Sequence, residues 1–221
     1  MDGNGRWAKE RKMKRTEGHK EGVKVVREIT KWCATNGIKF LSLYAFSTEN
    51  WTRPKIEVDF LMKLLEQHLK NESKTYDEYD IRFKVIGDTM GFSKKLRNLI
   101  TSLENSSAKN STLTQILALN YGSRDEIARA ILKMNKNGIP NGISKNDMIN
   151  LLENSLDTKE IPDVDLLIRT GGEMRLSNFL LYQCAYAELS FSKTLFPDFN
   201  IEELKKIIEN FKQRNRRFGA I

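Results

Sequence analysis

The stretch from 164 to 179, VDLLIRTGGEMRLSNF, contains the pattern on which the interpretation of the whole chain depends. It opens with an apolar run, Val164–Thr170, that has the length of a buried β-strand, and it continues into glycines, arginines and a serine. Continuous apolar strands are typical of parallel sheets that are covered on both faces. Ligands of such sheets collect beyond the carboxyl ends of the strands, so the polar residues after Ile168 are candidates for a binding site.

Similar apolar runs recur along the chain and alternate with segments of helical period. The further strand candidates are Phe40–Phe46, Ile81–Gly87 and Leu113–Asn120. Apolar residues at helical spacing run through 25–33, 58–69 and 201–211, and the clearest loop is 138–142. This alternation predicts an α/β fold: one domain over residues 1–221, with a central, mostly parallel sheet flanked by helices.

Composition narrows the class of protein. The 221 residues carry a formal net charge of +8, with 39% hydrophobic and 30% charged residues, which is compatible with a folded core. No apolar run approaches the ~18–20 residues of a membrane-spanning helix, and we expect no signal peptide. Two distant cysteines, Cys33 and Cys184, are expected to be buried free thiols in a reducing compartment. The positive charge indicates an anionic partner, which is a nucleic acid, a phosphorylated metabolite or an acidic membrane.

Arg169, Arg175 and Ser177 follow a single strand and form the most informative polar group. A guanidinium binds phosphate through two parallel hydrogen bonds, and a hydroxyl or backbone amide can complete such a site. The alternative is that these arginines are solvated, or that they pair with Glu173 and Asp165. The residues after the strand at 40–46, from Ser47 to Arg53, combine small polar side chains with an arginine in the same way.

The segment Asp2-Gly3-Asn4-Gly5 has two interpretations. Asp-Gly and Asn-Gly are ordinary turn dipeptides, and a turn is what chemistry alone favours. The functional alternative is a phosphate-binding glycine loop with a carboxylate that holds Mg²⁺, an ion that takes few protein oxygens and completes its shell with substrate phosphate. Neither the P-loop lysine motif nor G-x-G-x-x-G is present.

Three other ionisable residues stand out. His68 lies among leucines, so partial burial is expected, whereas His19 lies beside basic residues, where a phosphate contact is plausible. A zinc-type ligand spacing is absent. Glu188 is an acid within an apolar stretch, and pairing with an arginine is as plausible as a functional role.

Together these residues resemble the motif series of the cis-prenyltransferases, and most closely the bacterial undecaprenyl diphosphate synthase (isoprenyl transferase) group. The matching motifs are 2–8, 18–19, 44–54, 120–122, 169–179, 186–188 and the ending Arg216-Arg217-Phe218-Gly219. They span essentially the whole chain in order. Met174 stands where some relatives carry a histidine. The aspartate-rich signature of trans-prenyltransferases is absent.

The resemblance implies a Mg²⁺-dependent transferase that adds isopentenyl diphosphate units to an allylic diphosphate, such as farnesyl diphosphate, and makes a long polyprenyl diphosphate for the cell-wall lipid carrier. By position, Asp2 and Asn50 match the catalytic residues, Asn50 as the proton acceptor, and Asp2 and Glu188 match the metal ligands. The remaining positions match substrate contacts: Gly3, Asn4, Gly5, Arg6, Trp7, Arg15 and His19 for the allylic diphosphate; Ser47, Thr48, Glu49, Trp51 and Arg53 as further contacts; Arg169, Arg175, Leu176 and Ser177 for isopentenyl diphosphate.

The resemblance also implies a homodimer, a hydrophobic tunnel and a cytoplasmic enzyme that can touch the inner face of the membrane. We expect helix faces such as 58–69 and 99–103 to line the tunnel, and a bulky residue at Leu117 or Leu119 to shorten the product. Family members carry an apolar strand before the Asp-Gly-Asn motif. Because this chain begins at Met1, we expect that strand to be missing from it and the end at Asp2 to fray.

Two other classes of function compete with this interpretation. Residues 1–24 hold eight Lys/Arg against four acids, and 205–217 hold six against one, as in a nucleic-acid-binding module. However, base-stacking aromatics are not interleaved with these patches, so we expect no nucleic acid partner. A non-catalytic partner subunit is the other alternative, and retention of the motif residues argues against it.

Overall fold

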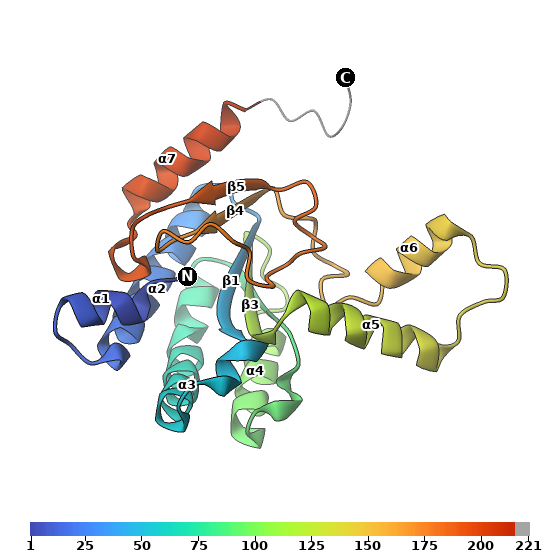
Figure 1. The fold of residues 1–221 in the computed structure, drawn as a ribbon, viewed down its shortest axis with the longest axis horizontal. Coiled ribbons are helices and arrows are strands. Elements are labelled where there is room, and N and C mark those ends of the chain that lie inside the picture. Colours follow the sequence, from blue (N-terminus) through green and yellow to red (C-terminus); the bar gives the residue numbers. More distant parts are fainter. Residues whose placement is uncertain (215–221) are drawn as a thin grey trace.

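The computed structural model describes residues 1–214, so the matched ending 216–219 lies outside the described residues. In chain order the elements are α1 (Asn4–Glu10), α2 (Arg15–Thr35), β1 (Phe40–Ser47), the 3₁₀ turn η1 (Thr48–Thr52), α3 (Lys55–Glu78), β2 (Ile81–Ile86), η2 (Thr89–Gly91), α4 (Lys94–Ser106), β3 (Leu113–Tyr121), α5 (Ser123–Asn137), α6 (Lys145–Glu153), β4 (Leu166–Arg169), β5 (Glu188–Phe191), η3 (Phe196–Asp198) and α7 (Ile201–Lys212). The predicted alternation of strands and helices is confirmed (Figure 1).

A three-stranded parallel sheet in the order β1-β3-β2 forms the centre of the molecule. The middle strand β3 is buried over almost its whole length, which explains why its sequence is continuously apolar. The register pairs Leu43 with Leu117 and Ile81 with Leu113. Helices α2, α3 and α4 contribute Val26, Leu69, Leu96 and other buried side chains to the core against this sheet.

A second sheet departs from the expected arrangement. Strand β4 pairs with β5 in parallel, and these two strands form a sheet separate from the first. The fifth strand was not predicted, because Glu188–Phe191 is short and contains a charged residue and a serine. The strands are therefore divided between two sheets, and Leu180 and Cys184, which precede β5, belong to a core cluster that includes residues of both sheets.

The beginning of the chain is a helix, so the turn that chemistry alone favours is wrong there. Gly3 has φ +107° and precedes α1, whose first turn already includes Asn4 and Gly5. Helix α1 packs closely on α2, because a Cβ on Gly18 would lie 2.0 Å from the backbone oxygen of Asn4. These close contacts hold residues 2–6 in one place relative to α2.

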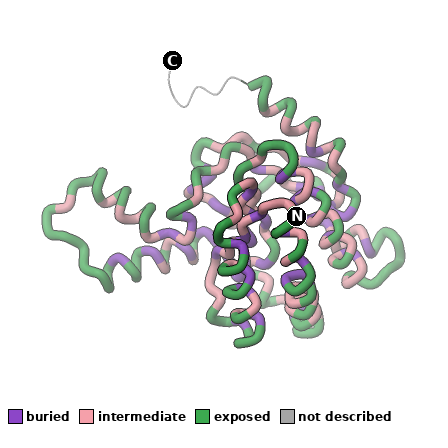
Figure 2. Tube along the Cα trace, turned by 180° about the vertical axis from the view of Figure 1, so that it is seen from behind, coloured by how far each residue is buried: buried purple, intermediate pink, exposed green. Residues whose placement is uncertain are grey.

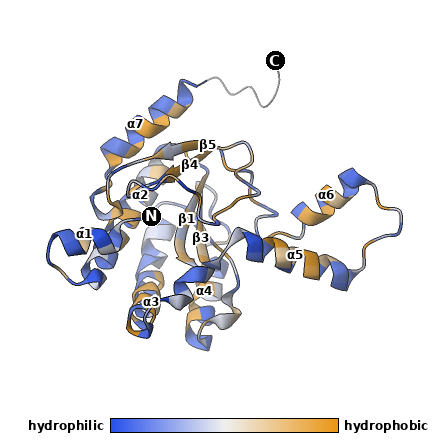
Figure 3. Cartoon of the chain, viewed as in Figure 1, coloured by the Kyte–Doolittle hydropathy of each residue, from blue (hydrophilic) through white to orange (hydrophobic). Residues whose placement is uncertain are grey.

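Helix α7 begins with a side-chain cap. The side chain of Asn200 accepts the N–H of Glu203 at 3.0 Å, and apolar and polar residues alternate along the helix (Figure 3). Cys33 and Cys184 are buried and free, and His68 is buried. Within residues 1–214, no helix is both long and apolar enough to cross a membrane.

Helices α5 and α6 form an arm that projects from the body of the molecule, with the predicted loop 138–142 at its tip (Figure 1). The base of α5 is buried, whereas the outer part of the arm is mostly exposed (Figure 2). At the base, the Glu126 carboxylate accepts hydrogen bonds from Tyr121 Oη at 2.6 Å and Gln183 Nε2 at 3.0 Å. The arm is thus attached through a buried polar network.

Candidate active site

A cavity of about 1280 Å³ runs from the carboxyl ends of β1 and β4 along α2, α3 and α7. Its mouth is polar and its interior is apolar. Most of the predicted site residues line it: Asp2, Gly3, Asn4, Gly5, Arg6, Arg15, His19, Ser47, Glu49, Asn50, Arg53, Arg169, Arg175, Leu176 and Ser177. Residues from four separate stretches of sequence therefore meet at one mouth, as the strand-end argument predicts.

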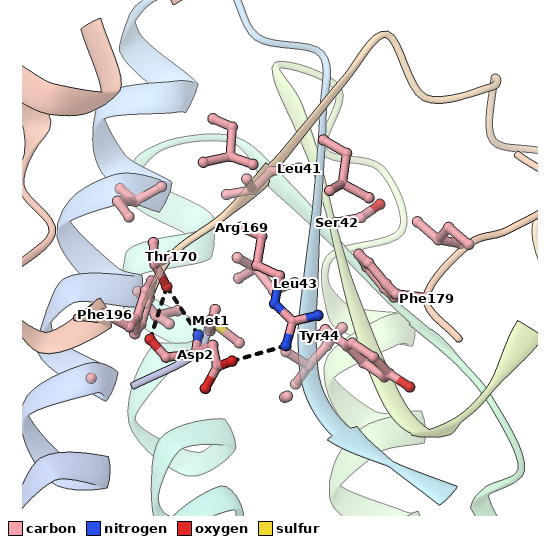
Figure 4. Close-up of a pocket in the computed structure, with 18 of the residues that line it drawn as sticks. Met1, Asp2, Leu41, Ser42, Leu43, Tyr44, Arg169, Thr170, Phe179 and Phe196 are labelled. Atoms are coloured by element: carbon pink, nitrogen blue, oxygen red, sulfur yellow. Dashed lines mark hydrogen bonds and ion pairs between the residues drawn. The ribbon is translucent and has the colours of Figure 1, made fainter. Parts of the chain in front are cut away.

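Asp2 is fixed at the mouth by its backbone as well as its side chain (Figure 4). The Thr170 hydroxyl accepts the Asp2 N–H and donates to the Asp2 carbonyl, both at 2.9 Å, and the Phe196 N–H also donates to that carbonyl at 2.9 Å. Arg169 Nη2 donates to Asp2 Oδ2 at 2.9 Å. Residue 2 is consequently anchored at several points, contrary to the fraying expected there.

The charge of Asp2 is set by two arginines. Burial of the carboxylate disfavours its ionisation, but the hydrogen bond and charge of Arg169 and the charge of Arg6 outweigh burial and lower the pKa of Asp2 below its ordinary value. Arg6 Nη2 lies 3.4 Å from Asp2 Oδ1. The carboxylate is therefore ionised at neutral pH and can serve as an oxygen ligand for a cation.

The segment after β4 folds back so that its polar groups converge. Arg169 Nη1 donates to Ser177 Oγ at 2.8 Å and also to the Arg175 carbonyl. Asn178 Nδ2 donates to Glu49 Oε1 at 3.0 Å, which joins this segment to the one after β1. Arg175 pairs with Glu173, as the alternative in the sequence analysis held, while Arg169 pairs with Asp2.

Asn50 lines the cavity, and its side chain also stabilises the local backbone. Its side-chain Oδ1 accepts the Ser47 N–H at 3.1 Å and so closes the turn η1 that follows β1. A carbonyl oxygen has two lone pairs, so this contact leaves one acceptor position on Asn50.

Three predicted substrate contacts, Trp7, Thr48 and Trp51, are not among the residues that line the cavity. The Trp7 indole N–H donates to Asp198 at 2.7 Å, and Arg11 stacks over the ring at 4.3 Å. The Trp51 indole N–H donates to Asn120 at 2.8 Å, and its ring packs on Phe46. Both indole N–H groups are therefore hydrogen-bonded within the protein, and the contact of these tryptophans with substrate stays a prediction.

Glu188 lies apart from Asp2 in the described chain. It is at the first position of β5, opposite Leu166, whereas Asp2 contacts the residues at the other end of the ladder, opposite Phe191. Three residues of strand correspond to about 10 Å. Glu188 pairs with Arg214, which is the structural alternative given for it. Its role as a metal ligand stays a prediction.

His19 lies in the wall between two arginines and a carboxylate. Burial, with the charge of Arg53, lowers its pKa to about 4, so the imidazole is neutral at neutral pH. Its Nε2 lies 3.8 Å from Oε1 of Glu57. That same oxygen accepts hydrogen bonds from Arg15 at 3.2 Å and Arg53 at 3.0 Å.

Two polar residues that contact the mouth, Glu57 and Thr170, were not singled out from the sequence, and Glu173 was named only as an alternative partner of the arginines. Glu57 holds Arg15 and Arg53, Glu173 lies within 3.8 Å of Arg6 and pairs with Arg175, and Thr170 anchors Asp2. Glu57 looks like an ordinary solvated charge in the sequence. Only its position four residues after Arg53 could have drawn attention to it.

The interior of the cavity is a mostly apolar tunnel. Its walls include Val26, Ile29, Leu43, Leu61, Leu65, Leu117, Leu119, Phe196 and Ile208, with Cys33 and His68 among them. The predicted contribution of α3 is confirmed by Leu61 and Leu65. The predicted contribution of 99–103 is wrong, because α4 packs on α3 and β2 and its residues are outside the lining of this cavity.

The carboxylates at the mouth suit Mg²⁺ better than a metal that needs a full set of protein ligands. Among residues 1–214, there is no group of three or more His, Cys, Asp or Glu side chains that could hold a metal ion. Mg²⁺ does not need one, since it is usually held by one or two carboxylates, substrate phosphates and water. Ionised Asp2, facing the cavity beside several cationic side chains, fits one such ligand position.

Comparisons with known proteins show what the whole chain is similar to. The family model described as "Putative undecaprenyl diphosphate synthase" matches residues 1–219. An isoprenyl transferase of Helicobacter hepaticus is 58% identical over 224 residues, which cover 100% of this chain and 94% of the relative. A ditrans,polycis-undecaprenyl-diphosphate synthase of Buchnera aphidicola, named as specific for (2E,6E)-farnesyl diphosphate, is 48% identical over 223 residues, covering 100% and 89%. Lavandulyl diphosphate synthase from Lavandula x intermedia, solved with dimethylallyl diphosphate, superposes with a TM-score of 0.93 at 37% identity, covering 100% and 95%.

Proposed function

The chain belongs to the undecaprenyl diphosphate synthase family and is a cis-prenyltransferase; on that premise, we propose that it extends farnesyl diphosphate with isopentenyl diphosphate units into a long polyprenyl diphosphate that serves as the cell-wall lipid carrier. The observation that carries the proposal is the continuity of one cavity, which joins a cationic mouth to an apolar tunnel. A diphosphate group fits the cationic mouth, and a growing hydrocarbon tail fits the apolar tunnel. Membership of an enzyme family argues against the non-catalytic alternative, and the absence of a nucleic acid partner stays a prediction.

The two ends of the mouth suggest where each substrate binds. Arg15, Arg53 and His19 lie on the side of α2 and α3 and would hold the allylic diphosphate. Arg169, Arg175 and Ser177 lie on the side of β4 and would hold isopentenyl diphosphate. Guanidinium groups suit both tasks because they bind phosphate oxygens in pairs.

In each cycle, the C–O bond of the allylic diphosphate breaks and its electron pair leaves with the diphosphate. C1 of the allylic chain bonds to C4 of isopentenyl diphosphate, and a proton leaves C2 of that unit as the new double bond forms. The arginines at the mouth stabilise the negative charge of the leaving diphosphate in a site shielded from water. Asn50 is our candidate for accepting the proton, through the lone pair that Ser47 leaves free.

The proposal includes Mg²⁺, with Asp2 as its ligand from the protein. The Asp2 carboxylate would hold Mg²⁺, and the bound ion would supply positive charge that stabilises the leaving diphosphate. Asp2 is held by Thr170 and Arg169, so its carboxylate is already oriented before substrate arrives.

Incorporation of labelled isopentenyl diphosphate tests the proposal. The protein is incubated with farnesyl diphosphate and Mg²⁺, with and without EDTA, and butanol-extracted products are sized by chromatography. Long, metal-dependent products are expected. Glu66→Gln is a matched control, since Glu66 on α3 pairs with Lys95 at 2.5 Å and is outside the cavity lining. No incorporation by the native chain would contradict the proposal.

The proposal extends to a homodimer that works at the inner face of the membrane. The net charge of +8 suits an anionic lipid surface and anionic substrates. Light scattering after gel filtration measures the oligomeric state. Co-flotation with vesicles of anionic and of zwitterionic lipid measures the membrane contact, which should require the anionic lipid.

A further inference from the structure

Glu57 is not among the residues that line the cavity, but its carboxylate contacts three residues that are. It lies in the first turn of α3, and its side chain is only 14% exposed. One oxygen, Oε1, accepts Arg15 Nη2 at 3.2 Å and Arg53 Nη1 at 3.0 Å, and it lies 3.8 Å from His19 Nε2. These three partners come from α2 and from the residue after η1, so Glu57 joins two elements that carry predicted substrate contacts.

The contacts leave the arginines able to bind an anion. A guanidinium has five N–H donors, and each arginine uses few of them on Glu57. With His19 neutral, two arginines and one carboxylate leave the group with a net positive charge. Without the carboxylate, two long side chains of like charge would repel each other and move freely, and a diphosphate would have to order them on binding.

We propose that Glu57 is a positioning residue. It aligns Arg15 and Arg53 for the allylic diphosphate before that substrate arrives. The inference rests on the proposed function, because that function assigns this side of the mouth to the allylic substrate. Glu57 acts through the two arginines and does not itself touch the diphosphate. It therefore affects one substrate and leaves the isopentenyl diphosphate side of the mouth unaffected.

A competing role makes the opposite prediction. If Glu57 merely occupied the place of the diphosphate as a counter-charge, its removal would make the site more positive and tighten anion binding. If it positions the arginines, its removal weakens anion binding although the site gains positive charge. The sign of the change in affinity separates the two roles.

The experiment compares Glu57→Gln, Glu57→Asp and the matched control Glu66→Gln. Steady-state kinetics give KM for farnesyl diphosphate and for isopentenyl diphosphate separately, and calorimetry gives the Kd of inorganic pyrophosphate. We expect Glu57→Gln to raise KM for farnesyl diphosphate and the Kd of pyrophosphate by roughly tenfold, as for loss of charge-assisted hydrogen bonds. KM for isopentenyl diphosphate should stay within about twofold of the native value, and Glu57→Asp, which keeps the charge, should recover part of the loss.

A double-mutant comparison tests whether Glu57 acts through the arginines. In an Arg15→Gln/Arg53→Gln background, Glu57→Gln should have no further effect on KM for farnesyl diphosphate. Tighter pyrophosphate binding by Glu57→Gln, an equal rise in both KM values, or a full additional effect in the double background would each overturn the inference. If Glu57→Gln fails to fold, Glu57→Asp replaces it in both tests: it should raise KM for farnesyl diphosphate in the native background and have no further effect in the Arg15→Gln/Arg53→Gln background.

Failure of the proposed function gives a different result. A native chain that binds pyrophosphate but incorporates no isopentenyl diphosphate refutes the function, and the pyrophosphate measurements alone then test the positioning role.

Discussion

Replacing Thr170 by valine should impair catalysis by releasing Asp2, although Thr170 is not itself expected to touch substrate. Thr170 is 3% exposed, and its hydroxyl makes two hydrogen bonds of 2.9 Å to the backbone of Asp2. Valine has nearly the same shape and cannot make either bond. In the variant, the Phe196 N–H still donates a hydrogen bond to the Asp2 carbonyl. The Asp2 N–H loses the acceptor that Thr170 provides, so it is affected more than the carbonyl.

The magnitude follows from those two bonds. Each is worth about 0.5–1.5 kcal/mol, so the variant should lose about 1–3 kcal/mol of stabilisation. If that energy holds the Asp2 carboxylate in its catalytic orientation, kcat/KM should fall about 5- to 100-fold, at roughly tenfold per 1.4 kcal/mol. The melting temperature should fall by several degrees, at about 2–4 °C per kcal/mol for a chain of this size.

The assay is isopentenyl diphosphate incorporation at saturating Mg²⁺, together with thermal unfolding of the same preparations. Thr170→Ser is the matched variant, because serine keeps the hydroxyl and should retain most of the activity. A Thr170→Val protein with native kcat/KM and a lowered melting temperature would show that the hydroxyl stabilises the fold without orienting Asp2. Equal losses in both variants would show that the methyl group, and not the hydroxyl, matters.

Three further predictions concern the mouth and the tunnel. Gly171→Ala should reduce activity at least tenfold in the same assay. Gly171 has φ +84°, and a Cβ there would lie 2.7 Å from Arg6 and 3.1 Å from the Asp2 backbone. Native activity of the variant would show that the loop can shift to accept the Cβ. Leu117→Trp should shorten the products on chromatography, because Leu117 lines the tunnel, and unchanged lengths would place the tail elsewhere. The pKa of His19 is about 4 in the folded protein and ~6.5 in the unfolded chain. Between pH 6.5 and pH 4 the unfolded chain therefore binds more protons, and the free energy of unfolding falls as the pH falls, by about 3 kcal/mol at most. Urea unfolding at pH 7.5 and 4.5 should show a smaller loss for His19→Gln than for the native chain, and equal losses would contradict this.

Much of the fold could be predicted because buried parallel strands have a plain sequence signal. Strands β1 to β4 are apolar runs between helices of regular period, and each was expected within a few residues of its observed bounds. Strand β5 was missed because it has four residues and begins with Glu188. The helix at Asn4 was missed because its start depends on close packing against Gly18, a contact that local turn preferences do not contain.

The site was predictable where residues follow strands and unpredictable where they act through distant partners. The spacing of Arg169, Arg175 and Ser177 placed them together correctly, because a single turn of chain joins them. Glu57 lies 42 residues from Arg15, and Thr170 lies 168 residues from Asp2, so nothing local marks either pair. Trp7 and Trp51 show the converse: their place in a motif does not reveal which way the rings point.

The division of the strands between two sheets has a mechanical consequence for the proposed extension of a product inside the cavity. Strands β1 and β4 both border the cavity but belong to different sheets. Moving one sheet relative to the other exchanges side-chain contacts and breaks no ladder hydrogen bond, whereas widening a tunnel within a continuous sheet would separate paired backbone groups. On the proposed function, the boundary between β1 and β4 is therefore where a lengthening polyprenyl tail can be accommodated without the loss of hydrogen bonds between strands.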